Sequence, residues 1–97
     1  MTNPTHYLIC YDIADDRRRN RVANLLEGFG RRVQYSVFEA VLDRRLFDKL
    51  LSQLQALLDP ADDSLTIYPV CAACVPRRIA MGLSAADWVQ EPVVFVV

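Results

Sequence analysis

Residues 6–13 read H-Y-L-I-C-Y-D-I, a run of apolar and aromatic side chains that is interrupted near its end by Asp12. A strand with one face in water alternates polar and apolar residues, and this run does not. It is rich in β-branched and aromatic residues and would be apolar on both of its faces. Such a pattern is typical of a strand that lies in the middle of a sheet and is buried on both sides.

Two segments show the apolar period of an amphipathic helix. Residues 17–29 follow Asp15-Asp16, which offer an N-cap, and precede Gly30, a good C-terminal stop. The second helix is capped by Asp43 and ends at Asp59-Pro60. Its apolar face is made of Leu46, Phe47, Leu50, Leu51, Leu54, Leu57 and Leu58.

Residues 32–42 are strand-like, but their alternation slips at Phe38. A change of phase indicates a bulge or a tight reversal near Ser36, so two short strands and one bent strand both stay open. A further strand is expected at 65–71, and Pro69 places it at the edge of a sheet or near its own end. The remaining signals are weaker: a short strand at 75–81, a turn at Gly82, one helical turn at 84–88 and a last strand at 92–97.

This order of elements predicts an α+β fold of the ferredoxin-like type, βαββαβ, with an extra C-terminal strand. One antiparallel sheet would carry two helices on one face, and residues 1–97 would form a single domain. The four-stranded plan has no place for residues 92–97, which are strongly apolar. Because an exposed apolar edge strand invites pairing, we expect 92–97 to join the sheet of a partner in a homodimer. The apolar fraction of 53%, high for a small domain, also favours a subunit interface.

The three cysteines are an odd number, and the chain opens without the pattern of a secretory signal. No apolar run is long enough to span a bilayer, so we expect no membrane association and a cytoplasmic protein with reduced thiols. Cys71-Ala-Ala-Cys74 is a C-x-x-C motif, but a zinc site needs four ligands and a thioredoxin-like redox pair needs a βαβ context. Two reduced thiols at a strand end are the simpler interpretation, and the role of the motif stays open.

Asp12 is the acidic residue in the first predicted strand. A carboxylate at the end of so apolar a run needs a helix N-terminus, an arginine or a metal ion beside it. Composition alone favours the first of these, an aspartate hydrogen-bonded to the start of the first helix. The alternative is a Mg²⁺ ligand, because Mg²⁺ takes one or two carboxylates and keeps several waters. A single carboxylate is a weak site, whereas two copies of Asp12 across a dimer axis would make a better one.

The basic residues are concentrated in one segment. Residues 15–32 carry six arginines and three acids, net +3, in a chain whose net charge is −1. Arginines in the first turn of a helix oppose its dipole, at a cost of roughly 0.3–1 kcal/mol each. They form either a solvated face paired with Asp15 and Asp16 or a site for phosphate groups, and the residues alone leave both open. The candidates for nucleic-acid contact are Arg17, Arg18, Arg19, Arg21, Arg31 and Arg32.

The other side chains with possible chemistry have simpler interpretations. His6, the single histidine, is expected to pack at the start of the first strand rather than to act as a base. The sequence contains no glycine-rich phosphate loop and no nucleophile elbow. Core packing is the default for the aromatic residues of the predicted strands, Tyr7, Tyr11, Tyr35, Phe38 and Tyr68.

Several of these segments together resemble one known family, the small CRISPR-associated adaptation endonucleases, which are ferredoxin-like companions of the CRISPR integrase. The match covers nearly the whole chain, and its R-x-Q-x-S-V-F-E segment is specific. The segments that carry it are Tyr7-Leu-Ile-Cys-Tyr-Asp-Ile13, Arg19-Asn-Arg21-Val22, Arg32-Val-Gln-Tyr-Ser-Val-Phe-Glu39, Ile67-Tyr-Pro-Val-Cys71 and Pro92-Val-Val-Phe95.

The resemblance implies a homodimer whose two sheets pack face to face, with Mg²⁺ bound at the interface by Asp12 of both subunits. It implies a metal-dependent phosphodiesterase that cuts single-stranded RNA or double-stranded DNA. It also implies that the protein holds new spacer DNA together with the CRISPR integrase subunits. By position, Asp12 is the catalytic residue and metal ligand, and Tyr11 and Phe38 shape the cleft. The arginines that match the family's phosphate contacts are Arg19, Arg21 and Arg32.

Three functional hypotheses follow. In the first, Mg²⁺ held by paired Asp12 residues lowers the pKa of a bound water that attacks a phosphodiester, and the arginines neutralise phosphate charge. In the second, the chain is a non-catalytic scaffold that binds double-stranded DNA, and Asp12 is dispensable. The third is a regulatory domain that senses a small molecule, which does not need arginines clustered at a helix start.

Overall fold

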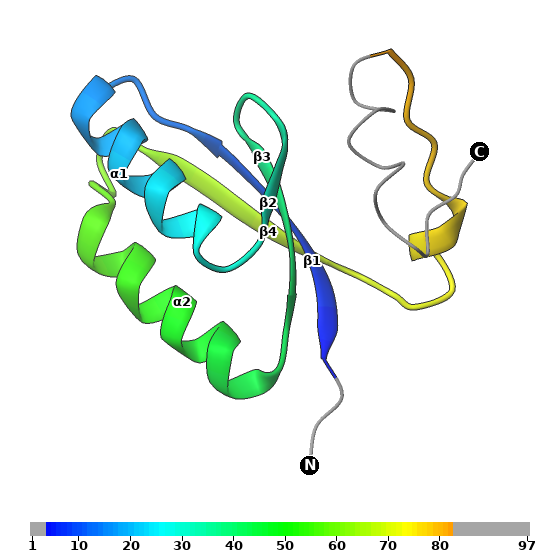
Figure 1. Cartoon of the computed structure of the whole chain (residues 1–97). Coiled ribbons are helices and arrows are strands. Elements are labelled where there is room, and N and C mark those ends of the chain that lie inside the picture. The colour runs from blue at the N-terminus through cyan, green and yellow to red at the C-terminus, as the bar shows by residue number, and fades with distance from the viewer. Residues whose placement is uncertain (1–3, 83–97) are drawn as a thin grey trace.

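The computed structural model describes residues 4–82 of the 97-residue chain, which form a four-stranded antiparallel sheet with two helices on one face (Figure 1). The sheet order is β2-β3-β1-β4, which is the ferredoxin-like arrangement that the sequence predicts. No helix in this part of the chain is long and apolar enough to cross a bilayer. The elements are β1 Thr5–Asp12, α1 Asp16–Glu27, β2 Arg31–Gln34, β3 Val37–Leu42, α2 Arg44–Leu57, β4 Ser64–Val70 and a short 3-10 helix, η1, Val75–Arg77.

Strand β1 lies in the middle of the sheet and is paired with β3 on one side and β4 on the other. Alternate residues of β1 face the helices. The Tyr7 ring stacks on that of Phe47 in α2, with 4.4 Å between centroids, and Ile9 and Tyr11 belong to the core. The other set of residues faces the open side of the sheet, where Leu8 and Cys10 are half-buried. The central position predicted for this strand is therefore confirmed.

The change of phase at Phe38 corresponds to a hairpin rather than to one bent strand. A two-residue turn at Tyr35 and Ser36 separates β2 from β3. The register between the two strands shifts between Arg32 and Gln34, where β2 holds one extra residue. Such a bulge increases the local twist of the pair. A reversal and a bulge thus occur close together.

Both predicted N-caps are confirmed. The Asp15 carboxylate accepts a hydrogen bond from the backbone N–H of Arg18 at 2.8 Å, and the Asp43 carboxylate accepts one from that of Leu46 at 2.8 Å. Each bond satisfies a backbone donor that the first turn of a helix leaves without an intrahelical partner. The two helices start at opposite ends of the sheet (Figure 1).

The helix stop predicted at Gly30 is wrong. Helix α1 ends at Glu27 with Gly28 as its C-cap, whose backbone N–H donates to the carbonyl oxygen of Leu25 at 3.1 Å. Gly30 is needed for a different reason, because a Cβ added there would overlap with the carbonyl oxygen of Glu39 in β3. The chain passes so close to the β3 backbone at this point that only glycine fits.

The C-terminal part of the described chain follows the predictions only in part. The edge position indicated by Pro69 is confirmed, because β4 is the outer neighbour of β1. The short strand at 75–81 is wrong, since η1 is a 3-10 turn and residues 78–81 have no regular structure. Proline in the first turn of η1 has a φ that suits a helical turn, and it lacks the N–H that a strand would need. The helical turn predicted at 84–88 and the last strand at 92–97 lie outside the described residues.

Replacing Gly30 with alanine is expected to destabilise the fold, because the new methyl group must displace the β3 backbone. The free energy of unfolding should fall by more than about 2 kcal/mol, toward the upper end of the range for point substitutions. The matched control is Gly28→Ala, where the added Cβ meets the Leu25 carbonyl oxygen at 3.4 Å and φ is −76°. Urea unfolding at one fixed protein concentration compares the two variants, and equal stability would contradict the close approach.

Candidate functional site

Asp12 is the last residue of β1, and it is exposed. The backbone donor at the start of α1, which composition assigned to Asp12, is bound by Asp15 instead. None of the ion pairs formed within residues 4–82 involves the Asp12 carboxylate. A carboxylate that neither caps the helix nor pairs with an arginine is available to a ligand.

Asp12 is the carboxylate that we consider as a metal ligand in the described part of the chain. Among residues 4–82, no group of three or more His, Cys, Asp or Glu side chains lies close enough together to hold a metal ion. Such a donor set does not suit zinc, which takes four protein ligands in structural sites and three in catalytic ones. It fits Mg²⁺, which binds through one or two carboxylates and keeps several waters. A second copy of the chain would add the second carboxylate.

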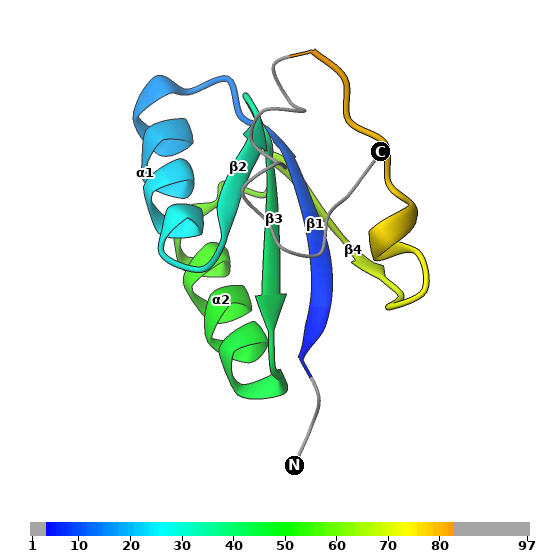
Figure 2. The same cartoon turned by 45° about the vertical axis from the view of Figure 1, so that its right-hand side comes forward.

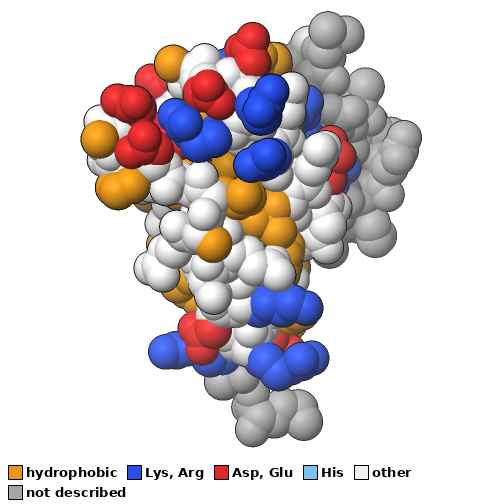
Figure 3. All heavy atoms as spheres, turned by 90° about the vertical axis from the view of Figure 1, so that its left-hand side faces the viewer, with side chains coloured by type: hydrophobic (Ala, Val, Ile, Leu, Met, Phe, Trp, Pro, Cys, Tyr) orange, Lys and Arg blue, Asp and Glu red, His pale blue; other side chains and the backbone are white. Residues whose placement is uncertain are grey.

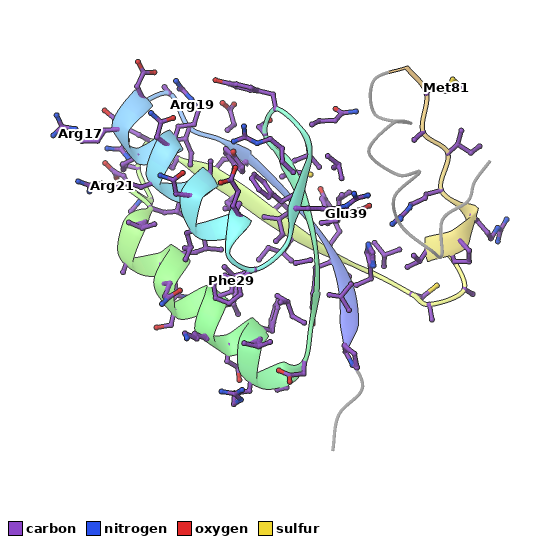
Figure 4. The ribbon with its side chains drawn as sticks, in the orientation of Figure 1. Arg17, Arg19, Arg21, Phe29, Glu39 and Met81 are labelled. Atoms are coloured by element: carbon purple, nitrogen blue, oxygen red, sulfur yellow. The ribbon has the colours of Figure 1, made fainter. Side chains whose placement is uncertain are left out.

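The first turns of α1 divide their arginines into two pairs. Arg17 and Arg21 are exposed and point away from the sheet (Figure 4), whereas Arg18 and Arg19 are half-buried. Figure 3 shows basic and acidic side chains side by side near the top of the molecule and again near its lower end. Pairing with acids is therefore observed for Arg18 and Arg19, whereas a phosphate site at Arg17 and Arg21 stays a prediction. Two arginines are paired with acids, and two are left on the surface.

Arg18 joins α1 to the loop that precedes β4. Its guanidinium donates two hydrogen bonds to the Asp63 carboxylate, from Nε at 2.8 Å and from Nη2 at 3.1 Å. The Asp63 side chain is fully buried and also accepts from the backbone N–H of Asp59 at 2.9 Å. The hydrogen bonds from Arg18 hold the pKa of Asp63 below its usual range. Part of the donor capacity of Arg18 is thus used inside the fold, and its contact with nucleic acid stays a prediction.

Arg19 holds the loop between β1 and α1. Its Nη1 donates to the carbonyl oxygen of Ile13 at 3.0 Å and to that of Ala14 at 3.3 Å, and its Nη2 pairs with the Asp16 carboxylate. The hydrogen bond with Asp16 raises the pKa of the Arg19 guanidinium, and nearby Tyr35 adds to this effect. Arg19 therefore fixes the backbone directly after the strand end that carries the exposed carboxylate.

The β2–β3 turn brings an exposed aromatic ring to the same region. Tyr35 is 71% exposed, so the expectation that it packs in the core is wrong. It is a turn residue, and the alternation of a strand does not extend to it. The Arg32 guanidinium lies 5.2 Å from the ring centre of Phe38 and 6.0 Å from that of Tyr35. An exposed ring beside arginine is typical of surfaces on which unpaired bases stack. Tyr68, which was also expected in the core, is 53% exposed.

Tyr11 and Phe38 lie in the hydrophobic core, and their rings are 6.2 Å apart. Both residues are nevertheless in contact with residues nearer the surface. The Phe38 ring lies beneath the Arg32 guanidinium, and the backbone N–H of Tyr11 donates to the Ser36 carbonyl oxygen in the turn at 3.1 Å. That hydrogen bond holds the turn against the end of β1. A role of these two residues in shaping a cleft stays a prediction.

Arg31 lies apart from the arginines of α1. It is paired in register with Glu39 and therefore faces the open side of the sheet, opposite the helices. Glu39 is buried, and its two carboxylate oxygens accept from Nη1 of Arg78 at 3.1 and 3.2 Å. His6 packs beside them, with its Nε2 3.5 Å from a Glu39 oxygen. Sequence reasoning missed this cluster because Glu39 and Arg78 are 39 residues apart.

The fold defines a protein of the ferredoxin-like class, with an exposed carboxylate at the strand end that precedes the arginine-rich start of α1. Comparison with models of known families identifies the family to which the chain belongs. Residues 5–78 match the model of the CRISPR associated protein Cas2 family, and the chain belongs to this family. The resemblance drawn from the sequence motifs is thereby confirmed.

Individual relatives agree in sequence and in structure. The CRISPR-associated endoribonuclease Cas2 4 of Rhodospirillum rubrum is 43% identical over 90 residues, which cover 93% of this chain and 73% of the relative. The crystal structure of Streptococcus pyogenes Cas2 has a TM-score of 0.72 and 28% identity, over 79% of this chain and 99% of that chain. A chain of a partial Cas6-RT-Cas1–Cas2 complex has a TM-score of 0.60 and 28% identity, over 79% of this chain and 90% of that one.

Replacing Asp63 with asparagine is expected to lower the urea midpoint near neutral pH, because the carboxylate that binds Arg18 is lost. The pKa of Asp63 is lower in the folded protein than in the unfolded chain. Its stabilising effect is therefore complete above the unfolded value, about 4, and is lost as the pH falls through the folded value. The difference between wild type and Asp63→Asn should shrink in acid.

Urea unfolding near neutral pH and at about pH 3 measures this difference. The matched control is Asp62→Asn, which removes an exposed carboxylate from the same loop and should change the midpoint little. A difference of the same size at both pH values would contradict the role of the Asp63 charge.

Proposed function

We propose that the chain is a Mg²⁺-dependent endonuclease of CRISPR adaptation. It acts as a homodimer and cuts phosphodiester bonds with Asp12 as its metal ligand and catalytic residue. The observation that carries the proposal is the position of Asp12. Its exposed carboxylate lies at the end of β1, and the loop that follows leads to the arginine-rich start of α1. The names of the relatives, which are endoribonucleases and an endonuclease, support it. The substrate is single-stranded RNA or double-stranded DNA.

Each surface residue of this region has a task in the proposed reaction. Arg17 and Arg21 bind phosphate groups along α1, because no acid pairs with them within residues 4–82. Tyr35 offers its exposed ring to an unpaired base. Asp12 holds the metal ion, and Arg19 keeps the adjoining loop in place. When bound, Mg²⁺ supplies positive charge to the phosphate and lowers the pKa of a coordinated water.

The proposed dimer places the open faces of two sheets against each other. By strand alternation, Asp12 belongs to the same face as Leu8 and Cys10, which the helices leave uncovered. A cavity of about 780 Å³ lies between this face and the chain's own residues 74–81, and its lining on the sheet includes the apolar Leu8, Val33 and Val37. Apolar surface of this kind supports a subunit interface. The expected exchange of residues 92–97 lies outside the described chain and stays a prediction.

A non-catalytic scaffold for double-stranded DNA is the second candidate. One structural neighbour is a chain from a complex that contains Cas1 and Cas2, which supports an integrase subunit of the Cas1 type as a partner of this chain. In that role the arginines of α1 bind DNA, and the carboxylate of Asp12 is not required. The nuclease and the scaffold use the same surface, so the effect of removing this carboxylate distinguishes them.

Replacing Asp12 with asparagine is expected to abolish cleavage, because the amide keeps the shape of the side chain but loses the charge that holds Mg²⁺. Wild type and Asp12→Asn are incubated with single-stranded RNA and with double-stranded DNA, with Mg²⁺ and with a chelator. Wild type should cut when Mg²⁺ is present, and the variant should be at least about 100-fold slower, since even loss of an outer-shell partner costs 10–100-fold. The matched control, Asp48→Asn, changes an exposed carboxylate on α2 and should cut normally.

Two outcomes would contradict the nuclease. Equal cleavage by wild type and Asp12→Asn excludes the metal-carboxylate mechanism. No cleavage by either protein, together with duplex binding that Asp12→Asn retains, supports the scaffold instead. Sedimentation of the same samples tests the assembly, and a monomeric mass at micromolar concentration would contradict the paired site.

Alanine at Arg17 or Arg21 is expected to weaken nucleic-acid binding without lowering the stability of the fold, since both side chains are exposed. Loss of one phosphate contact should reduce the slope of log K against log salt by about 0.9 for duplex DNA. The matched control is Arg45→Ala, an exposed arginine at the start of α2, at the other end of the sheet. An equal change of slope in Arg45→Ala would show that binding is not localised at α1.

A further inference from the structure

Cys71 and Cys74 lie in a tight turn directly after β4, and both are exposed. Their Sγ atoms are 3.2 Å apart. The Cys71 carbonyl oxygen accepts hydrogen bonds from the backbone N–H groups of Cys74 at 2.9 Å and Val75 at 3.2 Å, which close the turn. The Cα atoms at the two ends of such a turn are less than about 7 Å apart. That separation is within the range that a disulfide bridges without moving the backbone.

The two thiols are not equivalent. The side-chain hydrogen bond between the two thiols lowers the pKa of Cys71, with help from backbone N–H groups of the turn and from the nearby charge of Arg77. The same interaction raises the pKa of the Cys74 thiol. The thiolate is the reactive form in disulfide exchange, so Cys71 is the attacking sulfur and Cys74 the resolving one. Cys10, half-buried on the sheet, provides an internal comparison.

A zinc site is the competing use of a C-x-x-C motif. Zinc needs at least three protein ligands, and within residues 4–82 no third His, Cys, Asp or Glu joins the two thiols in a metal-binding group. The pair therefore has the geometry of a dithiol rather than that of a metal centre in this part of the chain.

We propose that Cys71 and Cys74 form a reversible thiol–disulfide exchange site whose substrate is a low-molecular-weight disulfide of the glutathione type. The Cys71 thiolate attacks one sulfur of the disulfide, forms a mixed disulfide and releases one glutathione thiolate. The Cys74 thiol loses its proton to solvent and attacks the Cys71 sulfur, which releases the second glutathione as a thiolate. The two protein thiols are oxidised to one disulfide, and the small disulfide is reduced to two thiols.

The two cysteines lie far from Asp12, so their oxidation leaves the proposed metal ligand unchanged. Val70, the residue before Cys71, is paired with His6 at the start of β1, whereas Asp12 is paired with Ser64 at the other end of β4. The exchange site and the Asp12 region therefore lie at opposite ends of the same strand pair. Figure 2 shows the turn and η1 beyond the end of β4, away from α1. The proposal does not depend on the nuclease function, and either one can fail without the other.

The experiment uses the full chain, reduced and then equilibrated in mixtures of reduced and oxidised glutathione, with mass spectrometry of acid-quenched samples. Wild type should lose two hydrogen atoms and carry no glutathione in oxidising mixtures, and it should return to the dithiol in reducing ones. Cys74→Ser should stop at a mixed disulfide with one glutathione on Cys71. Cys10→Ser should behave as wild type. Alkylation of the reduced protein should modify Cys71 about 10-fold faster than Cys10.

Three results would overturn the proposal. Wild type that retains glutathione on Cys71 would show that Cys74 does not resolve the mixed disulfide. Alkylation of Cys71 no faster than that of Cys10 would show that the turn does not activate the thiol. Zinc that copurifies with the chain and protects both thiols from alkylation would assign the pair to a metal site. Circular dichroism should confirm that both serine variants fold as wild type does, because Cys74 is exposed and the half-buried Cys10 is replaced by a residue of similar size.

Discussion

The hydrogen bonds that β1 makes on both of its edges are the constraint on which the rest of the structure depends. β3 and β4 pair with it along most of its length, and the helices cover the face to which Tyr7 and Ile9 point. Because successive side chains of a strand point to opposite faces, the same pairing assigns Asp12 to the open face with Cys10. The proposed metal ligand thus lies on the face that a second copy would cover. The paired site and the face-to-face dimer therefore depend on each other.

The arginines of α1 fall into two pairs with different surroundings. Cations in the first turn of a helix oppose its dipole, and acids beside them offset this effect. Arg18 is held by the buried Asp63, and Arg19 is held by Asp16 and the carbonyl oxygens of the loop. These two ion-paired arginines fix the first turns of the helix. The exposed side chains of Arg17 and Arg21 therefore project from a backbone of fixed position. This arrangement leaves Arg17 and Arg21 available for the phosphate contacts that we propose.

The sequence correctly predicts the features that depend on residues close together in the chain. The caps at Asp15 and Asp43 and the central strand are correct, because each depends on residues a few positions apart. Gly30 was misassigned since its role is a contact with the β3 backbone, which no local pattern reveals. Tyr35 is expected in the core because the sequence leaves open whether residues 32–42 form one bent strand or two strands with a reversal near Ser36. The ion pair of Glu39 joins residues far apart in the chain, and alternation alone does not name its partner.

The buried carboxylate of Glu39 explains why the chain after β4 returns to the open face. Glu39 is 8% exposed, and burying a charge is costly unless an opposite charge and hydrogen bonds compensate it. Arg78 supplies both, and removing one partner of a buried pair costs about 3–5 kcal/mol. The His6 end of β1 is therefore covered by the chain's own residues, whereas its other end, at Asp12, is exposed. The carboxylate that we propose as a metal ligand therefore lies at the end of β1 that the described residues leave exposed.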